Sequence, residues 1–235
     1  MTATVGVAVF PGTNCELDSI HAVESLGGTG KILWHSSKNL SEVDAVIIPG
    51  GFAHGDYLRP GAIARFSPLM SAITDFANNG GPVLGICNGF QMLCEANLLP
   101  GALLRNESLL FSSKEVILRV ENNSSIFTKS YEHHKTLRMP IAHAEGNYYA
   151  DQEALDRLEK EGRVMFRYAN QNGETTIESN PNGSANNIAG IINAHGNVMG
   201  MMPHPERAVE SVLGSVDGLE LFKSLLAHIV DPRPA

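Results

Sequence analysis

The chain has 235 residues, enough for one large α/β domain or two small ones, with 43% hydrophobic and 18% charged residues. Its formal net charge of -8, without a compensating cluster of Lys and Arg, argues against nucleic acid or an anionic membrane as a partner. The N-terminus carries no basic signal region and no apolar run reaches the length of a membrane span, so we expect a cytoplasmic protein.

The N-terminal half alternates short apolar runs with helical patterns. Strands are predicted at 5–10, 31–35 and 44–48, and helices at 16–26 and 63–76. Continuous apolar strands that alternate with helices predict a doubly wound, mostly parallel sheet flanked by helices, which is an α/β fold. The buried face of the first helix is expected to carry Leu17, Ile20, Val23 and Leu26.

The third strand runs into Pro49-Gly50-Gly51-Phe52, at the sheet edge where α/β proteins bind ligands. The two glycines would let backbone N–H groups face a cleft. An oxyanion hole and a plain turn both fit this stretch. The residues that follow, 53–57, are polar and contain glycine, as a mobile active-site loop would.

The stretch from Pro82 to Gln91 carries the strongest chemical signal. An apolar run leads to Cys87, which has Gly85 and Gly89 two residues away on either side, and a helical pattern follows. This spacing suits a sharp strand-to-helix turn, because a Cβ at either glycine would crowd the neighbouring backbone. Cys87 would then be a nucleophile at a helix N-terminus, where the thiolate is favoured. The alternative is an inert buried cysteine.

The three cysteines are Cys15, Cys87 and Cys94. They form neither a CxxC pair nor a disulfide pattern, and an odd count in a reducing compartment leaves free thiols. We therefore expect no structural metal site.

The C-terminal half has looser alternation, which predicts some antiparallel strands. Strands are predicted at 113–120, 163–168, 174–177, 188–193 and 198–202, with helices at 151–161 and from Asp217 to Val230, the last opening with an Asp-x-x-Glu cap. Between the first two of these strands, His143 and Glu145 would share one face of an extended chain, either in a site or on the surface. No repeat or long linker divides the chain, so residues 1–235 are read as a single domain.

A base and its orienting group are predicted in Met202-Pro203-His204-Pro205-Glu206. Proline biases the preceding residue towards extended geometry, which would point His204 and Glu206 the same way. A histidine held near a thiol, with a carboxylate that fixes its tautomer, is the arrangement of a catalytic triad. A lone histidine on a strand would more often be structural.

The combination of Gly85-Ile86-Cys87-Asn88-Gly89 with a distant His204-Pro205-Glu206 resembles the triad (class I) glutamine amidotransferases over essentially the whole chain. More narrowly, residues 10–15, 51–62 and 141–146 look like the family of glutaminase subunits of phosphoribosylformylglycinamidine synthase, in purine biosynthesis. The resemblance implies hydrolysis of glutamine by Cys87, His204 and Glu206, with the oxyanion held by backbone N–H groups of Gly51 and Asn88. It implies glutamine contacts at Phe52, Gln91, His143, Glu145 and Gly146.

The same resemblance implies a partner. A large synthetase subunit, with a small accessory subunit beside it, would take the ammonia and use ATP and Mg on its own chain to convert formylglycinamide ribonucleotide to formylglycinamidine ribonucleotide. No cofactor is expected in this chain, which has no P-loop pattern. Contact with the partner is predicted at Asn14, Cys15 and the loop after His54, and the isolated chain is expected to be nearly inactive.

Three other assignments stay open at the level of sequence. A cysteine-elbow protein of the DJ-1/PfpI group would have the thiol without the His204 and Glu206 partners. A non-catalytic regulatory subunit would keep the fold alone. Among amidotransferases, the glutaminase of the pyridoxal phosphate or histidine pathway is the alternative, disfavoured by the length of the chain and by the His143 segment.

Overall fold

The computed structural model describes residues 2–231. The strands are β1 Thr4–Val9, β2 Thr29–Trp34, β3 Ala45–Ile48, β4 Val83–Ile86, β5 Ala102–Leu104, β6 Ser112–Val120, β7 Thr136–His143, β8 Asn147–Tyr149, β9 Val164–Ala169, β10 Ile188–Ile192 and β11 Val198–Met201. The helices are α1 Glu16–Glu24, α2 Pro68–Asn78, α3 Asn88–Glu95, α4 Gln152–Lys160 and α5 Leu219–Val230.

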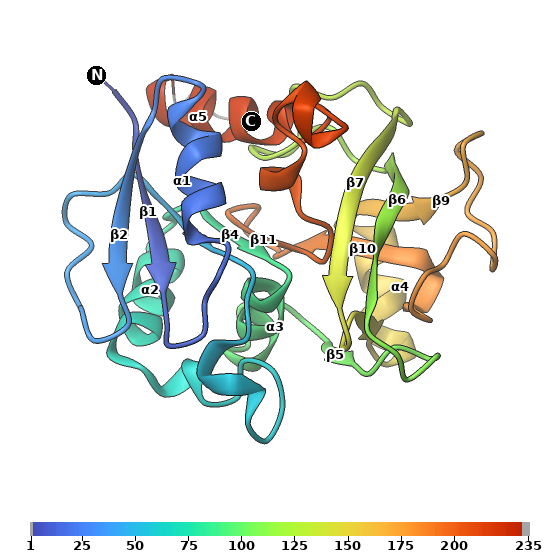
Figure 1. Ribbon diagram of the computed structural model, residues 1–235, viewed down its shortest axis with the longest axis horizontal. Coiled ribbons are helices and arrows are strands. Elements are labelled where there is room, and N and C mark those ends of the chain that lie inside the picture. The colour runs from blue at the N-terminus through green and yellow to red at the C-terminus, as the bar shows by residue number, and fades with distance from the viewer. Residues whose placement is uncertain (1, 232–235) are drawn as a thin grey trace.

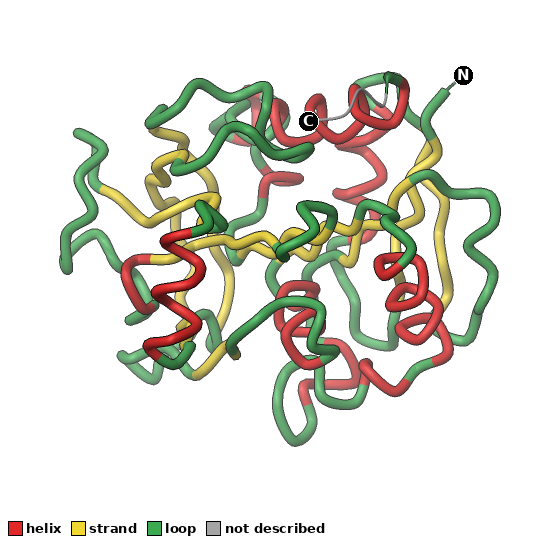
Figure 2. The backbone as a smooth tube through the Cα atoms, turned by 180° about the vertical axis from the view of Figure 1, so that it is seen from behind, coloured by secondary structure: helices red, strands yellow, loops and turns green. Residues whose placement is uncertain are grey.

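Nine strands form one mixed sheet in the order β2-β1-β3-β4-β11-β10-β9-β6-β7, and β5 pairs separately with β8. Neighbours from β2 to β11 are parallel, and neighbours from β11 to β7 are antiparallel. Helices α1 and α5 lie over one face of the parallel half and α2 and α3 over the other (Figures 1 and 2). The predicted α/β fold, with antiparallel strands in the C-terminal half, is confirmed.

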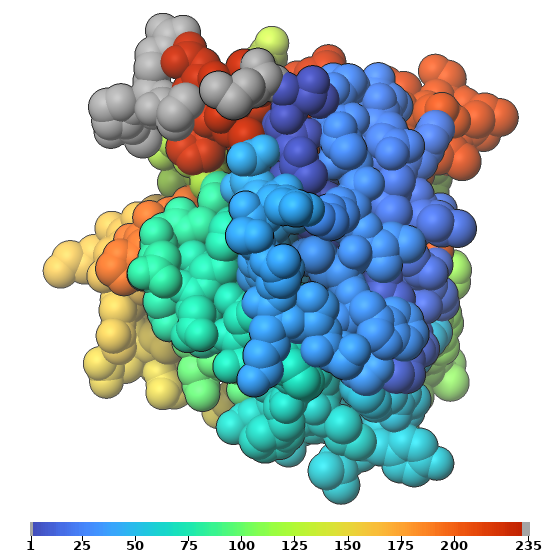
Figure 3. Space-filling model, turned by 90° about the vertical axis from the view of Figure 1, so that its left-hand side faces the viewer, coloured from blue at the N-terminus to red at the C-terminus, as the bar shows by residue number. Residues whose placement is uncertain are grey.

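Burial explains why the central parallel strands β3 and β4 are continuous apolar runs in the sequence. Every residue of β3 and of β4 is buried, because helices cover both faces of the sheet there. Strand β2 forms an edge, where Ile32 and Trp34 are exposed, and the N-terminal third of the chain forms much of the surface seen from that side (Figure 3). Within residues 2–231, no helix is long and apolar enough to cross a membrane.

The position of β11 decides where the site forms. This late strand lies parallel to β4, with Met201 opposite Ile86, and the backbone N–H of Cys87 donates to Met201 O at 2.8 Å. On the other side of β4, Ile48 of β3 lies opposite Gly85. The carboxyl ends of three neighbouring strands therefore meet at one edge of the sheet, and the segments after them share that edge.

Two predictions for the N-terminal helices are wrong. The predicted helix 63–76 is broken at Ser67, whose side chain accepts from the Met70 N–H and caps α2, with Pro68 as the first helical residue. In α1, Leu17 is 66% exposed, and the buried residues are Ser19, Ala22 and Val23. The short helix thus buries small side chains against the sheet, which a pattern of large apolar residues does not reveal.

Two predictions in the C-terminal half are also wrong. Residues 174–177 form no strand, and Ile177 is 88% exposed; asparagine side chains hold the loop instead, with Asn187 Nδ2 donating to Thr176 O at 2.7 Å. Helix α5 has no side-chain cap, because the Asp217 carboxylate accepts from the Arg138 N–H at 2.7 Å. The carboxylate joins β7 to the start of the helix.

Candidate active site

Cys87 lies at the turn between β4 and α3, as the glycine spacing predicts. Its φ of 53° and ψ of −106° are an unusual backbone conformation for a residue with a side chain. The turn requires glycine on both sides: a Cβ at Gly85 would meet the Gly89 backbone at 2.7 Å, and a Cβ at Gly89 would overlap the carbonyl oxygen of Ile48. Cys87 is 5% exposed, and its Sγ is 3.7 Å from Ala142 O.

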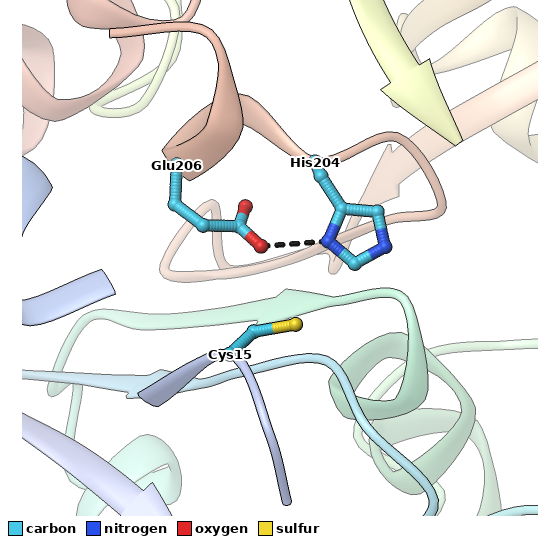
Figure 4. A group of neighbouring side chains, drawn as sticks. All are labelled: Cys15, His204 and Glu206. Carbon is cyan, nitrogen blue, oxygen red and sulfur yellow. Dashed lines mark hydrogen bonds and ion pairs between the residues drawn. The ribbon is translucent and has the colours of Figure 1, made fainter. Parts of the chain in front are cut away.

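His204 and Glu206 follow β11 at the same edge of the sheet. Nδ1 of His204 and Oε1 of Glu206 are 2.6 Å apart, and both side chains are buried (Figure 4). The chain is not extended through this segment, because Pro205–Arg207 form a 3-10 turn. The predicted pairing is present, and the short turn rather than an extended backbone brings the two groups together.

The electrostatics of His204 depend on opposing effects. Burial alone would lower the pKa of His204, but the charges of Glu206 and Cys87, with smaller contributions from the neighbouring thiols, raise that pKa well above its ordinary value. The imidazole is thus able to hold a proton taken from a neighbouring thiol. Oε1 of Glu206 fixes the Nδ1 side of the ring, which leaves Nε2 for the reacting groups.

The segment after β3 faces the same cavity. Gly51 forms a bridge with Thr13, in which Phe52 N donates to Gly12 O and Asn14 N donates to Gly50 O. In such a bridge the hydrogen bonds belong to the flanking residues, so the N–H of Gly51 itself points away from the Thr13 strand. Gly51 has a φ of 151° and lines the cavity with Cys87.

A cavity of about 150 Å³ lies between these elements. It is lined by Asn14, Cys15, Gly51, Phe52, Cys87, Phe111, Ala142, His204 and Arg207. A larger cavity of about 650 Å³ lies near Pro100, Arg157 and His195. That cavity has no thiol in its lining, so we place the chemistry in the smaller one.

The predicted glutamine contacts divide into two groups. Phe52 lines the cavity, is partly exposed, and faces the Phe111 ring at 6.5 Å between centroids. Gln91 instead uses its side chain within the protein: its amide donates to Glu145 O at 2.6 Å and accepts from Asn88 Nδ2 at 2.9 Å. Asn88 also accepts from Ala53 N at 3.0 Å, and so ties α3 to the loop after Phe52.

His143 is buried beneath the turn that joins β7 to β8. Its Nδ1 is 3.1 Å from Asn106 Oδ1 and its Nε2 is 3.5 Å from Asn182 Nδ2. The ring also packs on Gly146, where any Cβ would overlap it. Burial, with a smaller effect of the nearby His204, lowers the pKa of His143 to about 4. His143 and Glu145 do not share a face, because Glu145 turns outwards to within 3.6 Å of Arg105.

Sequence reasoning missed several residues of this site. Asn106 is fully buried, accepts from the Gly146 N–H and donates to His143 O, although no local sequence pattern marks it. Arg207 Nη2 donates to Cys15 Sγ at 3.2 Å. Cys15 itself is 2% exposed and lines the cavity, so its predicted role as a surface contact is wrong, whereas the neighbouring Asn14 is exposed.

Comparison with known proteins decides the family. Residues 2–221 match the CobB/CobQ-like glutamine amidotransferase domain. A phosphoribosylformylglycinamidine synthase subunit PurQ from Chlorobaculum tepidum is 56% identical over 227 residues, which are 96% of this chain and 97% of the relative. The chain belongs to the PurQ family of glutamine amidotransferases.

Other PurQ relatives agree with this family. The subunit from Salinibacter ruber is 52% identical over 97% of this chain and 98% of its own length. A chain of the structure of PurLQS from Thermotoga maritima superposes with a TM-score of 0.87 at 41% identity, covering 97% of this chain and 100% of that chain. These matches favour the purine assignment over the DJ-1/PfpI alternative and over the pyridoxal phosphate or histidine pathway.

Proposed function

We propose that Cys87, His204 and Glu206 hydrolyse the side-chain amide of glutamine to glutamate and ammonia. The observation that supports this most directly is the pairing of β11 with β4, which brings a buried His–Glu pair next to the sulfur at a strand-to-helix turn. Cys87 and His204 line one cavity, and Glu206 holds the histidine ring from behind, so a nucleophile, a base and an orienting carboxylate make up a complete triad.

In the proposed reaction, His204 takes the Cys87 proton and the thiolate attacks the amide carbon. The oxyanion of the tetrahedral intermediate accepts hydrogen bonds from the N–H groups of Gly51 and Asn88, a kind of donor worth about 3 kcal/mol each. His204 then protonates the departing ammonia, and a glutamyl thioester remains. Water, activated by the same imidazole, releases glutamate.

The charge state of the base supports this sequence of steps. Because the pKa of His204 is raised by Glu206 and Cys87, the ring keeps the proton until the leaving nitrogen needs it. Glu206 stabilises the imidazolium and holds its tautomer.

For the substrate, we propose contact with Phe52 and with the wall formed by Gln91, Glu145 and Gly146. His143 would support that wall from the protein interior, since its ring packs on Gly146 and is hydrogen-bonded to Asn106 Oδ1. Gln91 would position the turn through its bond to Glu145 O. These roles join α3 to the β7–β8 turn.

We further propose that the ammonia passes to a synthetase subunit that carries ATP and Mg and acts on formylglycinamide ribonucleotide. The names of the relatives, and the PurLQS assembly from which the Thermotoga maritima chain comes, support this partner. A small accessory subunit would complete the complex. The exposed Asn14 and the loop after His54, on the same edge as the cavity, are the proposed contacts.

The test uses the complex with the synthetase and compares glutamine with ammonium as the nitrogen source. We expect Cys87→Ser to abolish product formation from glutamine and to retain product formation from ammonium. Cys94→Ser is the matched control, because Cys94 is buried on α3 with its thiol directed at Pro100 O. A Cys87→Ser complex that still uses glutamine would overturn the proposal.

A further inference from the structure

The loop after β3 holds an unusual backbone conformation close to the nucleophile. His54, Asp56 and Leu58 have φ values of 55°, 53° and 70°, in the left-handed region that residues with side chains rarely adopt. Tyr57 and Leu58 are 74% and 90% exposed, whereas Asp56 between them and His54 is partly buried. Such a conformation persists where surrounding contacts enforce it, and here the contacts come from the start of α3, beside the loop (Figure 1).

Asn88 makes these contacts with its side-chain amide. Its Oδ1 accepts from Ala53 N at 3.0 Å, and its Nδ2 donates to Asp56 Oδ1 at 3.2 Å and to Gln91 Oε1 at 2.9 Å. Asn88 is 1% exposed, so the carbonyl and the NH₂ group of a buried amide are paired within the protein. Among these partners Asp56 is the one that carries a charge when ionised, and a charge-assisted hydrogen bond is roughly twice as strong as a neutral one.

The same asparagine connects the loop to the reacting groups. Asn88 follows Cys87 directly, and its backbone N–H is one of the two proposed oxyanion donors. Gln91, its side-chain partner, donates from Nε2 to Glu145 O at 2.6 Å and so joins Asn88 to the proposed glutamine wall. A shift of the Asn88 amide would therefore disturb the oxyanion donor and the wall together. Asp56 is outside the lining of the cavity around Cys87, so its contact with the reacting groups is indirect.

We propose that Asp56 is a positioning residue, whose ionised carboxylate holds the Asn88 side chain, and with it the oxyanion donor, in the arrangement that glutamine hydrolysis needs. The inference rests on the proposed function, because it gives Asp56 a part in that reaction. It makes the use of glutamine depend on the charge of a carboxylate outside the triad.

The pKa of Asp56 places the loss of this charge in a measurable range. Burial, with a smaller effect of the Glu145 carboxylate, raises the pKa of Asp56 to about 6, against the opposing effect of the hydrogen bond from Asn88. Asp56 is therefore ionised at higher pH and takes up a proton as the pH falls through about 6. Protonation replaces the charge-assisted bond to Asn88 by a weaker, neutral one.

The other charged groups near this loop have partners of their own. Arg59 on the loop pairs with Glu95 of α3 at 2.6 Å, and Arg105 lies 3.6 Å from Glu145. Burial lowers the pKa of His54, which disfavours a positive charge on its ring. Glu145 is thus the neighbour whose replacement should shift the pKa of the aspartate.

The test measures kcat/KM for glutamine in the complex with the synthetase, from about pH 5 to about pH 8.5, for the wild type and for Asp56→Asn. The amide keeps the shape and the acceptor oxygen of Asp56 and stays uncharged, so it imitates the protonated acid. Above pH 7 we expect the wild type to be on the order of fivefold faster. The ratio should fall towards 1 with its midpoint at a pH of about 6, because the wild-type aspartate is then protonated as well. Effects of pH on the triad cancel in this ratio.

Two further variants complete the experiment. Asp75→Asn, exposed on α2, is the matched control and should show a ratio of about 1 throughout. Glu145→Gln tests the claim without changing Asp56: loss of the neighbouring negative charge should move the acid limb of its own profile to lower pH. With ammonium as the nitrogen source, Asp56→Asn should show no such ratio, because ammonium bypasses the glutaminase site.

A ratio that does not change with pH would mean that Asp56 only supports the loop, and it would overturn the inference. Equal activity of Asp56→Asn and the wild type at about pH 8 would overturn it as well. The proposed function fails by a different result, which is continued use of glutamine by Cys87→Ser. Since the ratio between the wild type and Asp56→Asn does not depend on which residue is the nucleophile, the two failures are distinguishable.

Discussion

At the scale of single residues, Gly50 sets the spacing of the reactive groups. A Cβ there would be 2.7 Å from Cε1 of His204 and 3.4 Å from Cys87 Cβ. The site therefore depends on a residue that contributes no side chain. In the sequence, Gly50 is one of two adjacent glycines, and their pattern predicts a backbone near the substrate but not the packing of the imidazole against it.

Gly50→Ala tests this packing without removing a reacting group. The methyl group would displace the imidazole, and a displacement of about 1 Å at reacting atoms costs on the order of 10²-fold in rate. We expect that loss in kcat for glutamine, measured in the complex, with use of ammonium retained. Gly80→Ala is the control: no atom lies within 4 Å of its added Cβ, although its φ of 89° strains alanine. Equal activity of the two variants would argue against a packed imidazole.

His143 links the site to the stability of the fold through pH. The folded pKa of about 4 lies below the ordinary value of 6.5, so the unfolded chain binds a proton that the folded chain excludes between these values. The contribution of His143 to the free energy of unfolding is present above pH 6.5, and it is lost as the pH falls from 6.5 towards 4. Between pH 7.5 and 5 we expect a loss of about 2 kcal/mol at this residue.

Urea unfolding at these two pH values measures the effect. His143→Gln keeps hydrogen-bonding groups near Asn106 and Asn182 but has no titration in this range. The variant should lose less stability than the wild type on acidification. The same pH slope in both proteins would show that His143 is not the group responsible.

At the scale of elements, the turn from β7 to β8 depends on side chains that are distant in sequence. Asn106 accepts from Gly146 N at 3.0 Å, donates to His143 O at 2.9 Å and donates to Leu110 O at 2.9 Å. Asn182 donates to Gly146 O at 2.8 Å from the opposite side. The turn is thus fixed by amides from two loops.

Asn106→Leu removes these bonds at a fully buried position. Each buried donor or acceptor left unpaired costs about 1–3 kcal/mol, so we expect a loss of at least about 3 kcal/mol in the free energy of unfolding. Urea titration measures this loss, and weaker use of glutamine should accompany it. Asn172→Leu, in an exposed turn, is the control. A loss below about 1 kcal/mol for Asn106→Leu would contradict this account of the turn.

The elements that sequence predicts best are those with a local cause. The strand-to-helix turn at Cys87 needs Gly85 and Gly89, and both glycines lie within one stretch of five residues. The predicted strand 174–177 is a loop, because the side chain of Asn187, several residues later, donates to Thr176 O in place of a neighbouring strand. Pairings between distant residues leave no local pattern, which is also why Asn106 was missed.

At the scale of the whole molecule, the site is a consequence of strand order. Because β11 lies between β4 and β10, the ends of β4 and β11 are adjacent although more than a hundred residues separate them in sequence. The sequence predicted the members of the triad and the α/β class. The sequence does not reveal that Cys15, which follows β1, enters the same cavity. The position of Cys15 depends on the bridge between Thr13 and Gly51, which joins the loops after β1 and β3.

The residues at the cavity edge include Asn14, Phe52 and Phe111, whose side chains are exposed in the isolated chain. We expect the isolated chain to hydrolyse glutamine slowly and the synthetase to raise that rate. Steady-state glutaminase assays with and without the synthetase measure this, and equal rates would contradict a partner-controlled site.

The central claim is that Cys87, and not Cys15, is the nucleophile. The most direct measurement is to treat the complex with a diazo-ketone analogue of glutamine and to locate the adduct by peptide mass spectrometry. We expect one adduct on Cys87, prevented by excess glutamine and absent from His204→Asn. An adduct on Cys15, or a Cys87 that stays unlabelled in an active complex, would contradict it.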